Sequence, residues 1–190
     1  MNRTLTALTM SLAAFSAAPA LAQPAQGPTA VVSPQPLPLD DSRPRVFLGG
    51  SIDMGGAPDW QAAMTSALAD MDVVILNPRR PDWNPNWRPE ADEPEFRRQV
   101  EWELAALEAA DVIVMYFAPG TQSPISLLEM GLHARGGKLI VLAPDGFWRK
   151  GNVDITAQAY GVRQVQSLPE LTAAVREALA AAAAQGRFAR

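Results

Sequence analysis

Apolar residues gather in short runs along the chain, and each run is continuous rather than alternating with polar residues. The four strongest runs cover residues 45–50, 72–77, 111–117 and 138–144, and a weaker one covers residues 162–167. Continuous runs rich in β-branched residues are typical of strands that are covered on both faces. Helical patterns lie between or after them, at residues 59–69, 95–110, 124–135 and 169–184.

The alternation of strands and helices predicts parallel pairing through right-handed crossovers. We therefore expect a single α/β domain over residues 45–190, with a doubly wound, five-stranded parallel sheet of the flavodoxin or Rossmann-like kind. In such sheets, ligands bind beyond the carboxyl ends of the strands, near the point where the strand order reverses. The segments that follow the strands are therefore where a site is expected.

The segments before residue 45 are expected to lie outside this domain. Residues 1–22 combine a basic start, a small apolar run and Ala-Leu-Ala at 20–22, which predict an export signal cleaved after Ala22. An uncleaved anchor or a disordered tail is the alternative. Residues 23–44 are rich in proline and predict an extended linker. The protein is thus expected to be periplasmic or secreted, without membrane attachment after cleavage.

Composition narrows the candidate chemistry. The chain contains no cysteine and one histidine, so the sequence predicts neither disulfides nor a dedicated metal site. It has 16 Lys and Arg residues and 20 Asp and Glu residues, which gives a formal net charge of −4. Nucleic-acid binding is not expected, because it requires clustered positive charge. No cofactor is predicted.

One carboxylate, Glu103, interrupts the apolar stripe of the second predicted helix. At 100° per residue it falls in the same arc as Phe96, Val100 and Leu107. A carboxylate that faces the core costs free energy unless it pairs with another group or faces a cavity. Glu103 is therefore a candidate functional residue, and an ion pair with a neighbour such as Arg97 is the alternative.

A second carboxylate, Glu129, lies in the apolar helix that is predicted to begin after Ser123. Ser123 is a favourable N-cap residue, and the proline that follows suits the first helical position. Ser126, Glu129 and His133 then share an arc about 60° wide. This polar strip lines a cavity or faces solvent. The cavity interpretation is supported by the start of the helix at the carboxyl end of a strand, where such sheets bind ligands. His133 could act as an acid, but a lone histidine more often forms local hydrogen bonds.

The glycine-rich segment LGGSIDMGG, at residues 48–56, follows the first predicted strand. Its glycines would let the backbone approach a sugar, a hydroxyl group or a phosphate closely. The carboxylate of Asp53 disfavours a phosphate, and a plain tight turn is the alternative reading.

A long loop at residues 77–96 provides further candidates. Long loops in compact domains are usually lids or binding loops. In one interpretation, Trp83 and Trp87 stack on a base, and Asp82 and Asn84 form hydrogen bonds with the edge of that base. In the other, which is equally favoured, the two tryptophans hold the loop in place by packing.

These segments together resemble the nucleoside 2-deoxyribosyltransferase superfamily, particularly its deoxyribosyltransferase-like branch. The resemblance covers about residues 45–165 and rests on VFLGGSI, NPRRPDW, QVEWELAALEAADVIVMYF and SPISLLEMG. The first and last segments are also similar to deoxynucleoside monophosphate N-glycosidases. The resemblance implies a small nucleoside or nucleotide as the substrate and a homo-oligomeric assembly.

The resemblance also implies roles for individual residues. Glu129 is implied as the nucleophile that attacks C1′ of the sugar, and Glu103 occupies the position of an aspartate that assists at the leaving base. Asp53 stands where the monophosphate enzymes have a basic residue, which leaves the 5′ substituent open. The residues implied to line the sugar and its 5′ end are Gly49, Gly50, Ser51 and Ser123.

The expected function is therefore cleavage or transfer of an N-glycosidic bond of a nucleoside or nucleotide, with retention, through a covalent glycosyl-glutamate intermediate. Water as the second acceptor would make the protein a hydrolase, and another base would make it a transferase. The alternatives are a non-catalytic nucleoside-binding module and an exported NAD-cleaving effector.

Overall fold

The computed structural model describes residues 27–52 and 58–184. The expected export signal at residues 1–22 and the candidate residue Asp53 lie outside these ranges.

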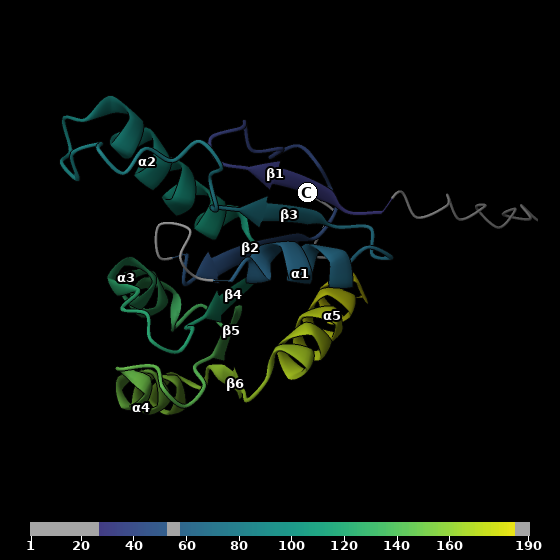
Figure 1. The fold of residues 1–190 in the computed structure, drawn as a ribbon. Coiled ribbons are helices and arrows are strands. Elements are labelled where there is room, and N and C mark those ends of the chain that lie inside the picture. The colour runs from purple at the N-terminus through teal and green to yellow at the C-terminus, as the bar shows by residue number, and fades with distance from the viewer. Residues whose placement is uncertain (1–26, 53–57, 185–190) are drawn as a thin grey trace, which may run out of the picture.

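Six parallel strands form one sheet in the order β1, β3, β2, β4, β5, β6 (Figure 1). Their bounds are β1 Thr29–Val32, β2 Arg45–Gly50, β3 Val74–Asn77, β4 Val112–Tyr116, β5 Leu139–Leu142 and β6 Arg163–Val165. The five predicted strands correspond to β2 through β6, and the predicted α/β class is confirmed. The strand order reverses between β2 and β4, so the carboxyl ends of these two strands mark the switch point of a doubly wound sheet.

The strand β1 corrects the prediction of five strands and of a linker over residues 23–44. Residues Thr29–Val32 pair in parallel with Val74–Asn77 at the edge of the sheet. An edge strand uses the backbone groups on only one of its sides, so flanking prolines do not prevent it from forming. The short run TAVV therefore extends the sheet beyond the predicted domain start.

Five helices cover the sheet. They are α1 Trp60–Ala67, α2 Pro94–Ala109, α3 Pro124–His133, α4 Lys150–Tyr160 and α5 Leu168–Ala184. Four of them were predicted, whereas α4 was not. Its buried residues are Val153 and Ala157, which give only a weak helical pattern of apolar positions. The helix α4 ends at Gly161, whose φ of 67° is favourable for glycine.

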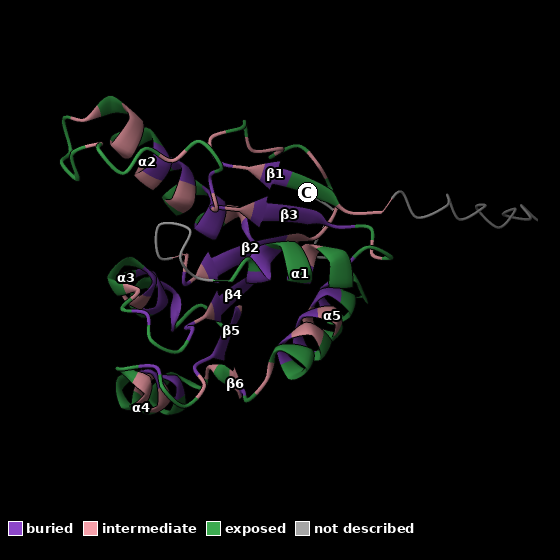
Figure 2. Cartoon of the chain, viewed as in Figure 1, coloured by how far each residue is buried: buried purple, intermediate pink, exposed green. Residues whose placement is uncertain are grey.

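The sheet lies between two layers of helices (Figure 1). On one face, side chains of β2 to β5 pack against α2, α3 and α4, with Phe47 and Met115 at the centre of this core. On the other face, α1 and α5 pack against alternate residues of the same strands, among them Leu48 and Val114. Figure 2 shows the central strands buried and the outward faces of the helices exposed. This double burial explains the continuous apolar runs.

None of the helices that the structure describes is both long enough and apolar enough to cross a membrane.

Candidate active site

The end of β2 meets β4 at the switch point of the sheet. Gly50 pairs with Tyr116, and the backbone N–H of Ser51 donates a hydrogen bond to the Tyr116 carbonyl at 2.8 Å. Gly50 has φ of 132°, and a Cβ atom there would lie 2.7 Å from the backbone nitrogen of Tyr116. Glycine is therefore required at position 50 for the close approach of two backbones, which brings Ser51 to the edge of the sheet.

Three hydroxyl groups converge at this edge. The Oγ atom of Ser51 lies 2.7 Å from Oγ1 of Thr121 and 2.6 Å from Oγ of Ser123. The backbone N–H of Ala118 donates to Ser51 Oγ at 2.8 Å, and the Thr121 hydroxyl donates to the Ala118 carbonyl at 2.8 Å. This hydroxyl cluster joins β2 to the β4–α3 loop. Thr121 was not among the predicted site residues, although it lies only two positions before Ser123.

Ser123 precedes α3, as predicted, but its hydroxyl group does not cap the helix. Its backbone is left-handed, with φ 46° and ψ 50°, which is costly for a residue other than glycine. This conformation turns the hydroxyl toward Ser51 instead of toward the first turn of α3. The first N–H groups of α3 therefore receive no side-chain cap, and such groups favour an anionic or oxygen-rich ligand.

The polar strip of α3 faces the interior. Ser126, Glu129 and His133 are all buried, and Glu129 is only 7% exposed. The apolar side chains on the opposite side of the helix are instead exposed, at 57% for Ile125 and 60% for both Leu128 and Leu132. The strip therefore does not face solvent, and its burial agrees with the cavity-lining interpretation.

On α2, the buried line is occupied by Gln99, Trp102 and Ala106, and Glu103 lies at its margin. The alternative of an ion pair between Glu103 and Arg97 is not seen among the described contacts; Arg97 instead forms an ion pair with Glu101 at 3.0 Å. Glu103 accepts a hydrogen bond of 2.9 Å from Nε2 of Gln99. Gln99 was not predicted as a site residue, although it stands one helical turn before Glu103 on the same face.

The two carboxyl groups influence each other electrostatically. Burial raises the pKa of Glu103 to about 7, and the hydrogen bond from Gln99 only partly opposes this effect. Burial and, to a smaller extent, the negative charge of Glu103 together raise the pKa of Glu129 to about 8. Carboxyl groups that share a low-dielectric site hold protons at pH values where solvated ones have lost them. The pair can therefore combine a nucleophile with a proton donor near neutral pH.

His133 lies deeper along α3 and belongs to a different environment. Burial lowers its pKa, and the nearby charge of Lys138 lowers it further, while Glu108 opposes the shift. Lys138 lies just before β5, and its ammonium group binds backbone carbonyls at the end of α2, including that of Leu107 at 2.9 Å. His133 thus lies toward the amino ends of the strands, away from the switch point.

The loop after β3 packs mainly on itself. The rings of Trp83 and Trp87 contact edge to face, with centroids 5.1 Å apart. The Arg80 guanidinium lies 4.7 Å from the Trp87 ring centroid and donates to Asp82 at 2.7 Å. Oδ1 of Asn84 accepts a hydrogen bond from a backbone N–H within the same loop. Among the described contacts of Asp82, Trp83 and Asn84, none reaches either glutamate, and the packing alternative accounts for them.

Gly49 has a packing role in the structure. It lies within β2, and a Cβ atom there would come within 2.8 Å of the Phe47 ring and of the Met115 sulfur. Two hollows, of about 220 Å³ and 510 Å³, lie between β5 and α5 and between α3 and α4. Neither is lined by Glu103 or Glu129.

Within residues 27–52 and 58–184, no group of three or more His, Cys, Asp or Glu side chains is arranged to hold a metal ion.

Residues 43–147 match the family model described as "Nucleoside 2-deoxyribosyltransferase like". The chain belongs to this family. The match spans both glutamates and the hydroxyl cluster, whereas β1 precedes it. The family name supports, at a coarse level, glycosyl transfer involving a nucleoside.

A solved structure has the same fold. The crystal structure of a conserved protein from Enterococcus faecalis V583 superposes with a TM-score of 0.53 at 13% sequence identity, covering 71% of this chain and 98% of that chain. Comparison with curated proteins gave no match.

Proposed function

We propose that this nucleoside 2-deoxyribosyltransferase-like protein cleaves or transfers the N-glycosidic bond of a nucleoside or nucleotide through a glycosyl ester on Glu129. The observation that supports this most directly is that two carboxyl groups on neighbouring helices, the half-buried Glu103 and the buried Glu129, interact electrostatically. Their helices flank β4, next to the switch point where doubly wound sheets bind ligands.

In the first step, the carboxylate of Glu129 attacks C1′ of the sugar. The bond between C1′ and the base nitrogen breaks, and its electron pair stays on that nitrogen, which takes a proton from the Glu103 carboxyl group. The products of this step are the free base, a glycosyl ester on Glu129 and a negatively charged Glu103. The reactive form has Glu129 charged and Glu103 protonated. Glu103 has the lower pKa of the two, about 7 against about 8, so this is the less populated of the two singly ionised forms.

In the second step, Glu103 accepts a proton from the incoming acceptor as that acceptor attacks C1′. The ester bond between C1′ and the Glu129 oxygen breaks, and its electron pair restores the carboxylate. Two displacements at one carbon give net retention of configuration. Water as the acceptor gives hydrolysis, and a second base gives transfer.

The hydroxyl cluster is proposed to hold the 5′ end of the sugar. Ser51 and Ser123 supply polar oxygens within 2.6 Å of each other at the amino end of α3. The uncapped N–H groups of α3 add hydrogen-bond donors there. A 5′ hydroxyl or a 5′ phosphate fits this chemistry, so both belong in the substrate panel.

The decisive experiment uses a panel of nucleosides, nucleotides and NAD, with chromatographic detection of the released base. The native protein is expected to release base from at least one compound, and Glu129→Gln is expected to release none. Intact-mass measurement during turnover should detect a glycosyl adduct on the native protein. Binding without base release or adduct would favour the non-catalytic alternative, and release of nicotinamide alone would favour the NAD-cleaving alternative.

Self-association is part of the proposal. The outer face of α3 carries three exposed aliphatic side chains, Ile125, Leu128 and Leu132, which together form an apolar patch. Exposed patches of this kind commonly mark protein interfaces. Together with the homo-oligomeric assembly implied by the resemblance, this supports a second copy of the chain as the occupant.

Export is also proposed. It rests on residues 1–22, whose sequence has the features of a cleaved signal. Mass spectrometry of the protein recovered from outside the cytoplasm is expected to give a chain that begins at Gln23. Recovery of the full-length chain in the cytoplasm would contradict this.

A further inference from the structure

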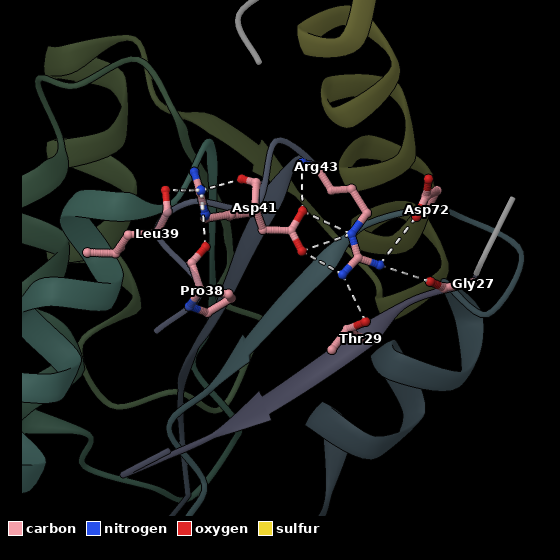
Figure 3. A network of polar contacts seen from close by, with 8 residues as sticks. Gly27, Thr29, Pro38, Leu39, Asp41, Arg43 and Asp72 are labelled. Atoms are coloured by element: carbon pink, nitrogen blue, oxygen red, sulfur yellow. Dashed lines mark hydrogen bonds and ion pairs between the residues drawn. The ribbon is translucent and has the colours of Figure 1, made fainter. Parts of the chain in front are cut away.

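The residues before the family match form an arm that is fixed to the domain. This arm, residues 27–42, contains β1, and just beyond it the backbone N–H of Ser33 donates to the Asn77 carbonyl at 3.1 Å. Arg43 ties its two ends together, since its guanidinium binds Thr29 at 3.0 Å and Asp41 at 2.7 Å (Figure 3). The arm is therefore an ordered part of the edge of the sheet.

The arm packs against the hydrophobic core on the face of the sheet that α2 covers. Nε1 of Trp102 donates to the Gln35 carbonyl at 2.7 Å, and Leu37 packs against the core cluster that contains Trp102. Arg45 binds the backbone carbonyls of the arm, including that of Leu39 at 2.9 Å. These contacts hold α2, the helix that carries Glu103, against the arm.

A chain of buried hydrogen bonds leads from the arm to the candidate active site. Ser33 is 3% exposed and Gln99 is 5% exposed. The Ser33 hydroxyl donates to Oε1 of Gln99 at 2.6 Å. Nε2 of Gln99 donates to the Pro78 carbonyl at 3.0 Å and to Oε1 of Glu103 at 2.9 Å. The side chain of Gln99 thus connects a serine of the arm to a carboxyl group of the candidate site.

Every polar atom of the Gln99 amide has a partner in this arrangement. Its oxygen accepts from Ser33, and its two N–H groups face oxygens that accept. If the amide were turned over, its oxygen would face the Pro78 carbonyl and the Glu103 carboxyl group, and both contacts would be repulsive. Without the Ser33 hydroxyl, the amide oxygen would be buried without a donor, and the side chain would gain by moving toward water.

We propose that Ser33 is a positioning residue for Glu103 and that it acts by holding the Gln99 amide in its donating orientation. This inference rests on the proposed function for its catalytic meaning, since Glu103 is the proton donor and acceptor of that reaction. The arm, which precedes the family match, thereby supports the site through Gln99, on the same face of α2 as Glu103.

The proposal predicts a direction for the ionisation of Glu103. The hydrogen bond from Gln99 favours the charged carboxylate and lowers the pKa of Glu103, against the larger effect of burial. Glu103 is contacted by Gln99, and the two groups that Gln99 also contacts, Ser33 of the arm and Pro78 of the β3 loop, are uncharged. The described charged group that interacts with it is Glu129 of α3. Loss of Ser33 should therefore raise the pKa of Glu103 further.

The test is an NMR titration of the full-length protein with 13C-labelled glutamate, in which Glu103 is assigned from the spectrum of Glu103→Gln. Ser33→Ala is expected to raise the Glu103 midpoint by about half a pH unit or more. Ser33→Thr, which keeps a hydroxyl group, should restore it. Thr29→Ala is the matched control, because it removes a hydroxyl hydrogen bond from the same arm outside this chain of bonds, and it should leave the midpoint unchanged.

An unchanged midpoint in Ser33→Ala, or an equal shift in Thr29→Ala, overturns the proposal. If Ser33→Ala does not fold, Ser33→Cys replaces it, because a thiol is a weaker donor of similar size and should give a smaller upward shift. The titration needs no turnover, so a native protein without activity would refute the proposed function while this inference is still tested. In an active enzyme, the pH profile of kcat should move upward with the midpoint while KM changes little.

Discussion

The negative charge of Glu103, on α2, raises the pKa of Glu129, on α3, although β4 separates the two residues along the chain. This relationship exists because successive helices α2 and α3 lie on the same face of the sheet and both reach the switch point. Each carboxyl group alone resembles a buried acid with no evident purpose. Together they form a pair able to move one proton while one oxygen attacks a carbon atom.

Replacement of Glu103 should affect both catalysis and its partner. Glu103→Gln is expected to lower kcat by about 10²-fold or more, since it removes the general acid and base. It should also lower the pKa of Glu129, because the opposing negative charge is gone. Glu101→Gln is the matched control on the same helix, at an exposed position, and should keep kcat within about twofold. Equal activity losses in the two variants would contradict the assignment.

The stability of the protein should fall as the pH rises through neutrality. The ordinary glutamate pKa is 4.5, and the folded values are about 7 for Glu103 and about 8 for Glu129. Between these limits the folded protein retains protons that the unfolded chain has released, so the free energy of unfolding decreases with pH. This stabilisation is complete below about pH 4.5 and is lost by about pH 8.

Urea unfolding at several pH values from 5 to 8.5 would measure this effect against the double variant Glu103→Gln, Glu129→Gln. The native protein should lose more stability across the range than the double variant. His133 has a lowered pKa and acts in the opposite direction, but it is present in both proteins and cancels in the difference. Parallel profiles would contradict the raised pKa values.

Ser123 allows backbone strain to be separated from hydroxyl chemistry. Ser123→Ala and Ser123→Gly both remove the hydroxyl group from the cluster, but only glycine relieves the left-handed backbone at φ 46°. Ser123→Gly should therefore be more stable than Ser123→Ala by about 1 kcal/mol. Both should raise KM by a similar factor, about tenfold, if the hydroxyl binds substrate. If KM rises only in the less stable variant, Ser123→Ala, the proposed binding role of the hydroxyl group is contradicted.

Two glycines should respond to alanine in opposite ways. At Gly50, a Cβ atom would overlap the backbone of Tyr116, so Gly50→Ala is expected to cost more than about 2 kcal/mol of unfolding free energy. At Gly151, inside α4, no atom lies within 4 Å of the Cβ position. Gly151→Ala should therefore stabilise the protein by about 0.5 to 1 kcal/mol. Thermal unfolding of the two variants would measure both effects.

The apolar patch on α3 should control assembly. The native protein is expected to sediment as a dimer or larger species, and Leu128→Ser combined with Leu132→Ser should shift it toward the monomer. Leu39→Ser is the control, since Leu39 is 66% exposed but lies in the arm. Sedimentation velocity would measure the result. A native monomer at micromolar concentration, or dissociation caused equally by Leu39→Ser, would contradict the patch as an interface.

The periodicity of the chain was sufficient to predict most of the fold. The strands β2 to β6 are continuous apolar runs because helices cover both faces of the sheet, and that burial leaves a local signal in the sequence. The strand β1 and the helix α4 left weaker signals. β1 is a short edge strand among prolines, and α4 buries only Val153 and Ala157, so both depend on neighbours that lie far away in sequence.

The residues of the candidate site also differ in how far the sequence could predict them. Glu103 was predicted as a site residue because it interrupts an apolar stripe, and Glu129 because it lies in a polar strip of an apolar helix. The structure buries Glu129 but leaves Glu103 half-buried at the margin of the buried line of α2. The loop residues Trp83 and Asn84 were placed in the site as one of two interpretations. Their described contacts fit the packing interpretation, and binding of a base by these residues stays a prediction. Composition cannot distinguish a ring that stacks on a ligand from one that stacks on its neighbour.

The sequence by itself determined the alternation of strands and helices, the switch point that follows from it, and the two acids that interrupt apolar faces. Only the tertiary structure decided that these acids share one electrostatic environment, that Ser123 turns its hydroxyl to Ser51, and that Ser33 reaches Gln99. Periodicity reports which side of an element is buried, because burial repeats with the local geometry. It carries no information on which distant group is met there, since that depends on how the sheet assembles.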